Sequence, residues 1–216
     1  MNDATLANRQ AAIANRSHLV RRYLKPVLFV VCLLPFVRLL LGAFGIAGFG
    51  LGTNEVETVQ DVTGNWGLRF LVITLAITPL RDWFDAPWLI QLRRMLGLYA
   101  FFYVLLHFLT WLFLDQGLYW AGIGEDIAKR PFITIGFLAL LLLIPLAVTS
   151  TNGMMRRLGK RWKSLHRLVY GITLLGVWHF WWQVKADIRE PALYLAITVV
   201  LLGWRAWKAR RRFASP

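Results

Sequence analysis

Residues 95–114 read MLGLYAFFYVLLHFLTWLFL, a run without a charged side chain that contains one histidine, His107. About 20 apolar residues are enough to cross the ~30 Å hydrocarbon core of a bilayer as one helix. Comparable runs recur along the 216 residues, of which 57% are hydrophobic, and the mean hydropathy is +0.52. These features predict an all-α, polytopic membrane bundle rather than a soluble domain.

Six apolar runs predict six transmembrane helices. Their expected bounds are about 27–49, 64–80, 95–114, 132–149, 165–184 and 191–207. Pro131 and Pro191 suit the first turn of a helix, where the missing N–H costs nothing. No convincing internal repeat is visible, which speaks against a transporter built from repeated halves. A small transporter or assembly factor is therefore the weaker, non-enzymatic alternative.

The basic residues predict the orientation. Lys and Arg gather in the amino-terminal tail, after the second and fourth helices, and at the carboxyl end, whereas most carboxylates lie in the other loops. By the positive-inside rule both termini are expected to be cytoplasmic. The chain then divides into a cytoplasmic basic tail (1–24), a transmembrane domain (25–208) and a second basic tail (209–216).

The net charge of +14 could suggest nucleic acid, but the charges form short blocks between apolar runs. That distribution is typical of membrane topology and contact with anionic lipid, so nucleic acid is not expected as a partner. The glycine-rich residues 42–52 lack the lysine and the preceding strand of a phosphate loop. They predict a loosened helix end.

Two histidines are expected at one depth. His107 follows Met95 by 12 residues, or roughly 18 Å of helix, and His179 follows His166 by 13, or roughly 19.5 Å. An imidazole in hydrocarbon is costly unless it is paired or bound to metal. A matched pair on separate helices favours axial ligation of a haem b over two hydrogen-bonded core histidines. Zinc is less favoured because no Cys, carboxylate or further His shares that level.

His166 lies at the other end of its helix and has several open interpretations. It can bind a second haem near the cytoplasmic surface, contact a flavin or quinone, or pair with a lipid headgroup. Arg93 and Arg94 lie at its level on the third helix, where arginine can bind a haem propionate or a flavin phosphate, or anchor the helix at headgroups. On the outer side, Arg38 and Arg69 can either snorkel or neutralise haem propionates.

Three stretches carry a family resemblance. They are GLRFLVITLAITPLR (67–81), RRMLGLYAFFYVLLHFLTW (93–111) and TSTNGMMRRLGKRWKSLHRLVYG (149–171). They resemble the haem-binding membrane subunits of the bacterial periplasmic methionine sulfoxide reductase system, within the ferric-reductase-like transmembrane superfamily. The wider superfamily often has a second histidine on the third helix, where this chain has Arg93 and Arg94. That departure speaks against a regular ladder of four histidines and two haems.

The resemblance implies an electron-transfer subunit of the bacterial inner membrane. One or two haems b would be held by His107, His179 and His166, with FMN as a further candidate cofactor. Electrons would come from the quinone pool or a cytoplasmic flavin reductase. They would pass to a periplasmic molybdopterin-containing subunit that reduces methionine sulfoxide in oxidised proteins. The chain itself would hold no catalytic site for that reaction. The alternative is a transmembrane ferric or cupric reductase that needs no protein partner.

Overall fold

The computed structural model describes residues 17–184 and 186–214. All regular secondary structure in that part of the chain is helical, which confirms the predicted all-α class. The basic residues Arg9, Arg16 and Lys185, which contributed to the orientation argument, lie outside the described residues.

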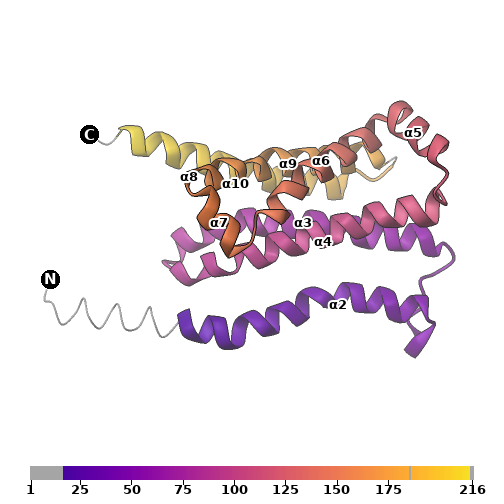
Figure 1. Ribbon diagram of the computed structural model, residues 1–216, viewed down its shortest axis with the longest axis horizontal. Helices are drawn as coiled ribbons and strands as arrows, with labels where there is room; N and C mark the ends of the chain where they lie inside the picture. Colours follow the sequence, from indigo (N-terminus) through magenta and orange to yellow (C-terminus); the bar gives the residue numbers. More distant parts are fainter. Residues whose placement is uncertain (1–16, 185, 215–216) are drawn as a thin grey trace, which may run out of the picture.

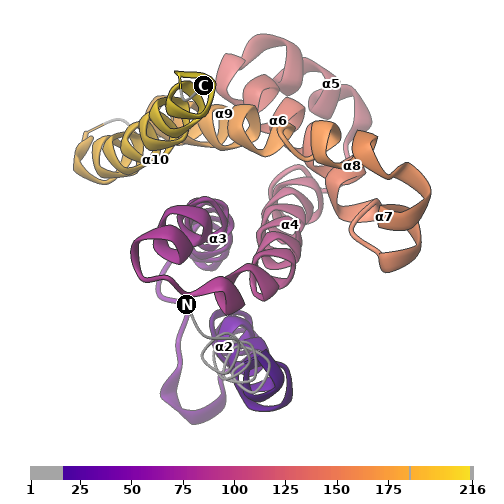
Figure 2. The same cartoon turned by 90° about the vertical axis from the view of Figure 1, so that its left-hand side faces the viewer.

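Six long helices in the described part match the six predicted runs, and they lie side by side along one direction (Figures 1 and 2). They are α2 (Lys25–Ala43), α3 (Glu55–Trp83), α4 (Arg93–Thr110), α6 (Pro131–Val148), α9 (Leu168–Gln183) and α10 (Arg189–Ala214). Helical turns also precede α2 at Val20–Leu24 and extend α4 through Trp111–Asp115. Shorter helices connect the long ones: α5 (Trp120–Lys129), α7 (Asn152–Leu158) and α8 (Lys160–Leu165).

The helix ends differ from the expected bounds for local reasons. α2 ends at Ala43 rather than near residue 49, because Gly45 adopts the left-handed region with φ +63°. The glycine-rich stretch is thus an unwound helix end. α3 begins at Glu55 rather than near residue 64, because the Asn54 side chain accepts a hydrogen bond from the Glu57 N–H and caps the helix. Pro131 occupies the first turn of α6, as expected.

Four stretches in the described part are both long and apolar enough to cross a membrane: Ser17–Ala43, Arg93–Asp115, Pro131–Val148 and Arg189–Arg211. The other two predicted spans fall short of that standard. α9 has only 16 residues, and α3 includes polar residues such as Asn65 and Arg69 within its apolar stretch. The protein is therefore a multi-pass membrane protein, and four of its described helices meet this standard of length and hydropathy.

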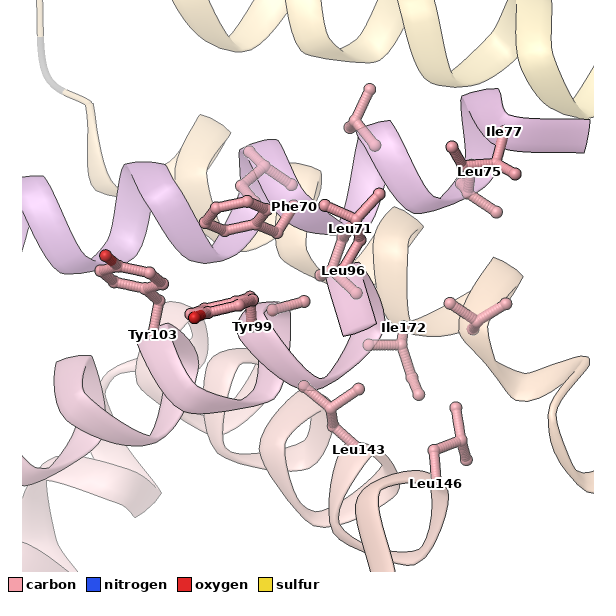
Figure 3. Packing of buried hydrophobic residues seen from close by; sticks show 14 of the residues in the cluster. Phe70, Leu71, Leu75, Ile77, Leu96, Tyr99, Tyr103, Leu143, Leu146 and Ile172 are labelled. Atoms are coloured by element: carbon pink, nitrogen blue, oxygen red, sulfur yellow. The ribbon is translucent and has the colours of Figure 1, made fainter. Parts of the chain in front are cut away.

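The core lies where α3 and α4 pack against α6 and α9. Phe70 of α3 lies against Tyr99 and Tyr103 of α4, and Leu71 and Leu75 of α3 belong to the same cluster (Figure 3). Leu143 of α6 and Ile172 of α9 continue the same cluster. Large apolar side chains on α2 and α10 are exposed instead, among them Phe29, Val30, Val199 and Val200. Exposed apolar faces of this kind suit contact with lipid tails.

Candidate haem-binding site

The structure brings His107 of α4 and His179 of α9 together. Their ring centres are 6.0 Å apart and the ring planes are nearly perpendicular, at 83°. An iron held by two imidazole nitrogens at about 2 Å each places the ring centres about 6 Å apart. The observed spacing therefore leaves room for one metal ion between the rings.

Each histidine ring is fixed by a backbone carbonyl. The His107 Nδ1 lies 3.0 Å from the Gln60 carbonyl oxygen, and the His179 Nδ1 lies 2.7 Å from the Phe132 carbonyl oxygen. A carbonyl oxygen only accepts, so each Nδ1 must carry the proton and donate it. This leaves Nε2 of both rings with a free lone pair, which is the form of histidine that binds metal.

A glycine on the neighbouring helix makes room for each ring. A Cβ built at Gly64 would lie 3.0 Å from the His107 Nδ1, and one built at Gly136 would lie 2.7 Å from the His179 Nδ1. The separation at Gly136 is shorter than real Cβ contacts, and the one at Gly64 is so tight that the His107 ring would have to shift by a few tenths of an ångström. Each glycine lies one helical turn after the residue whose carbonyl accepts the hydrogen bond from the ring. The glycine and the carbonyl together form the binding position of the imidazole, called its seat below.

The two seats are copies of one arrangement. In each, the histidine follows the carbonyl residue by 47 positions, and the glycine lies between them on the first helix of a pair. One pair is α3 with α4, and the other is α6 with α9. The structure thus contains a structural repeat that the sequence analysis did not find. The repeat is not visible in the sequence because the groups that accept hydrogen bonds from the histidines are backbone carbonyls, and the residues that carry them, Gln60 and Phe132, differ in type.

A cavity of about 510 Å³ surrounds the two rings. Its deeper walls are apolar and include Leu68, Leu71, Val104, Phe108 and Leu140. Its mouth lies at the end of the bundle where α3 and α6 begin, and is lined by polar groups that include Asn54, Glu57, Asp61, Asp115 and Arg130. The volume is within the range of cofactor pockets, and apolar walls with a polar mouth suit an amphipathic planar cofactor.

The donor set favours haem over a protein-bound metal ion alone. Among the residues that the structure describes, no group of three or more His, Cys, Asp or Glu side chains could hold a metal ion. His107 and His179, as two neutral imidazoles in a cavity with apolar walls, would be the residues that hold the iron of a haem. The residues present therefore fit a haem with two histidine ligands.

His166 is not part of this cavity. It ends α8, and its ring stacks on Trp162 with the ring centres 3.9 Å apart. Its Nε2 lies 3.1 Å from the Thr149 hydroxyl, which itself donates to the Pro145 carbonyl. With its proton used there, the hydroxyl accepts from the His166 Nε2. Partial burial and the nearby charge of Arg93 lower the pKa of this imidazole.

The four arginines predicted to bind a cofactor, Arg93, Arg94, Arg38 and Arg69, lie at different places and do not form one cluster. Arg94 is exposed and donates to the Asn152 side chain of α7, whereas Arg93 is half-buried and lines a second pocket. Neither lines the cavity of His107 and His179. On the other side of the molecule, Arg69 donates to the Tyr194 hydroxyl at 3.0 Å, and Arg38 is exposed on α2.

The arginine at the cavity mouth is Arg130, which the sequence analysis did not single out. It directly precedes α6 and lies 3.2 Å from the Asp126 carboxylate. In sequence it is one basic residue in an outer loop, and nothing in the local pattern marks it. Only the packing of α6 against α4 and α9 places it beside the histidine cavity.

Comparison with known proteins shows to which broad class of membrane protein the chain belongs. Residues 63–177 match the family model described as "Ferric reductase like transmembrane component". The match includes all of α4 with His107 and the first part of α9, and it ends two residues before His179. The fold and the histidine pair thus define a ferric-reductase-like transmembrane protein. No solved structure matches the chain.

Individual relatives narrow the class. The chain is 60% identical over 158 residues to the "Protein-methionine-sulfoxide reductase heme-binding subunit MsrQ" of Xanthomonas oryzae pv. oryzae (strain MAFF 311018), covering 73% of this chain and 72% of that protein. It is 51% identical over 193 residues to the protein of the same description from Bordetella pertussis, covering 87% of this chain and 92% of that protein. The chain belongs to the MsrQ family.

Proposed function

We propose that this protein is the haem b electron-transfer subunit of a methionine sulfoxide reductase system. The observation that carries the proposal is the pair His107 and His179, with both Nδ1 atoms engaged by carbonyls and the ring centres 6.0 Å apart. The printed names of the relatives, which call them heme-binding subunits, support the same cofactor.

The protein's own contribution is to hold and tune the ligands. The carbonyls of Gln60 and Phe132 fix the imidazole tautomer and increase the basicity of Nε2. Leu68, Leu140 and the other apolar walls exclude water and lower the local dielectric. When bound, a b-type haem supplies one-electron redox chemistry. Arg130 at the mouth would pair with a propionate.

The proposed route places the donor and acceptor on opposite sides of a bacterial inner membrane. The donor is the quinone pool or a cytoplasmic flavin reductase, with FMN as a candidate intermediary. The acceptor is a periplasmic molybdopterin-containing subunit that repairs oxidised methionine in proteins. The histidine cavity opens at the end of the bundle where carboxylates replace basic residues, and the positive-inside rule assigns that end to the periplasm.

We also propose six crossings with both termini in the cytoplasm. α3 and α9 are the two helices that fall short of the usual length or hydropathy, yet they are the central ones. α3 packs on α4, α9 and α10, and α9 packs on α6 and α10. A helix surrounded by protein needs less apolar surface than one that faces lipid.

The test is the reduced-minus-oxidised absorption spectrum of the purified protein. Parent protein should show a six-coordinate b-type haem. His107→Ala and His179→Ala should each remove this signal, while His166→Ala should keep it, because His166 lies outside the cavity. A His179→Ala variant with the spectrum of the parent would refute the assignment. Recovery of a single haem in His166→Ala and two in the parent would assign a second haem to His166.

The ferric or cupric reductase remains the alternative, because the matching family model carries the ferric reductase description. The two functions differ in their need for a partner. Pre-reduced protein should lose its electron to ferric citrate alone if it is a metal reductase. Under the proposal, oxidation should require the periplasmic subunit and its sulfoxide substrate.

A further inference from the structure

The second pocket lies at the end of the bundle opposite the histidines. It has a volume of about 690 Å³ and is formed by the ends of α3 and α10 and the starts of α4 and α9. Its lining contains five cationic side chains and a single carboxylate among the described residues: Arg81, Arg93, Arg167, Arg205 and Lys208, with Asp82. The haem proposal makes no use of this pocket.

The carboxylate neutralises only part of this charge. Asp82 accepts hydrogen bonds from Arg81 and from Lys208, joining α3 to α10. Although burial raises the pKa of Asp82, these two hydrogen bonds outweigh it and the pKa is lowered, so the carboxylate is ionised at neutral pH. Within the described residues, Arg93, Arg167 and Arg205 lie within ion-pair distance of no carboxylate.

These three arginines come from different elements and border one hollow. The Arg205 guanidinium is held by the carbonyls of Leu201 and Leu75, and it lies over the Tyr170 ring at 5.5 Å. Because internal contacts already fix it, its remaining N–H groups need little reordering to meet a ligand. Guanidinium groups arranged in this way match the oxygens of a phosphate, which they bind in bidentate fashion.

The surroundings of the pocket indicate a lipid rather than a free anion. Val199 and Val200 are exposed on α10, with 56% and 63% of their surfaces accessible, one to two turns before Arg205. They lie on the side of the pocket that faces the membrane interior. Trp204 borders the pocket, and tryptophan is the residue typical of the headgroup level. Val199 and Val200 lie about 120° and 140° around α10 from Arg205 and do not line the pocket, whereas Leu202 does, so the acyl chains of a lipid bound at the arginines would pass Leu202 to reach the exposed apolar surface of α10.

We infer that this pocket is a binding site for the phosphodiester headgroup of an anionic phospholipid, with Arg93, Arg167 and Arg205 as its recognition residues. The lipid would lie between α10 and the α4–α9 face and hold the ends of these helices together. Basic pockets between transmembrane helices at the cytoplasmic side recognise lipid headgroups by this chemistry. The inference rests on the membrane location of the protein and not on haem binding.

The experiment titrates purified protein in zwitterionic detergent with phosphatidylglycerol, and in separate arms with phosphatidylcholine and with inorganic phosphate. Native mass spectrometry counts bound lipid, and the thermal unfolding midpoint reports stabilisation. Phosphatidylglycerol should bind the parent and raise its midpoint, whereas phosphatidylcholine should not. Removing one arginine should weaken binding about fivefold, so Arg93→Gln with Arg167→Gln should weaken it about 25-fold.

The matched control is Arg157→Gln with Arg161→Gln, which removes the same charge from exposed positions outside the pocket. It should bind phosphatidylglycerol within about twofold of the parent. Equal loss in both double variants would reduce the effect to net charge and overturn the site. Stabilisation by inorganic phosphate equal to that by phosphatidylglycerol would overturn the lipid. Arg167→Gln alone, at an exposed position, serves if the helical circular dichroism signal or the size-exclusion profile shows that the double variant fails to fold.

Discussion

At the scale of single residues, two glycines decide whether the histidines can take their positions. Gly64 and Gly136 allow the rings of His107 and His179 to reach carbonyls on the neighbouring helices. Glycine within a helix costs roughly 0.5–1 kcal/mol relative to alanine, so its presence here needs a compensating role. Their role is to leave space, because a methyl group would force the ring to move at Gly136 and would crowd it at Gly64.

Gly136→Ala should therefore impair haem binding even though it favours the helix. The new Cβ would lie 2.7 Å from the His179 Nδ1, so the ring must shift and its hydrogen bond to Phe132 must lengthen. Loss of such an orienting contact typically weakens metal binding about tenfold or more. The haem-to-protein ratio after purification measures this loss of haem binding. Gly171→Ala, with nothing within 4 Å of its Cβ, is the control. Equal haem content in both variants would contradict the role given to Gly136.

At the scale of elements, a tyrosine of α4 completes the backbone hydrogen bonding of α2 beside a proline. Pro35 lies inside α2 and cannot donate a backbone N–H. Beside it, the Tyr103 hydroxyl of α4 donates to the Cys32 carbonyl at 2.8 Å and accepts from the Phe36 N–H at 3.2 Å. The hydroxyl thus bridges two backbone groups that lie one helical turn apart in α2. Tyr99 adds a second tie, from its hydroxyl to the Phe29 carbonyl at 2.7 Å.

Tyr103→Phe should consequently destabilise the protein by about 1–3 kcal/mol, because it leaves a buried carbonyl and a buried N–H without their partner. The thermal unfolding midpoint in detergent should fall, while the haem spectrum stays unchanged because His107 keeps its own carbonyl contact. Tyr119→Phe, at an exposed position, should leave the midpoint where it was. An unchanged midpoint in Tyr103→Phe would show that water or repacking replaces the hydroxyl.

At the scale of the whole molecule, charge and burial divide the bundle into two ends. The histidine cavity opens among carboxylates at the end where α3 and α6 begin, and the basic pocket lies where α3 and α10 end. The candidate haem-binding cavity and the concentration of arginines therefore lie at opposite ends of the bundle. A bias of basic residues toward one end of the bundle is typical of a membrane protein with a fixed orientation.

Single cysteines in a Cys32→Ala background test the six crossings. Thr53→Cys, Tyr119→Cys and Ile188→Cys should react with an impermeant maleimide in cells whose outer membrane is permeable. His18→Cys, Phe84→Cys and Arg157→Cys should react only after the inner membrane is opened. All six positions are exposed. Labelling of Phe84→Cys from outside would show that α3 does not cross, and labelling of His18→Cys would reverse the orientation.

The sequence by itself determined the helical class, the approximate place of each long helix, and the candidate histidine pair at matched depth. Apolar length and periodic spacing are local properties, so they can be read without a fold. The roles of Gln60, Gly64, Phe132, Gly136 and Arg130 could not be predicted, because every residue has a backbone carbonyl and the sequence does not say which helix a given glycine or arginine will face. Their roles depend on which helices become neighbours. These neighbours are set by the packing of α3 on α4 and of α6 on α9. The same packing sets the tautomer of the two imidazoles and the distance between them.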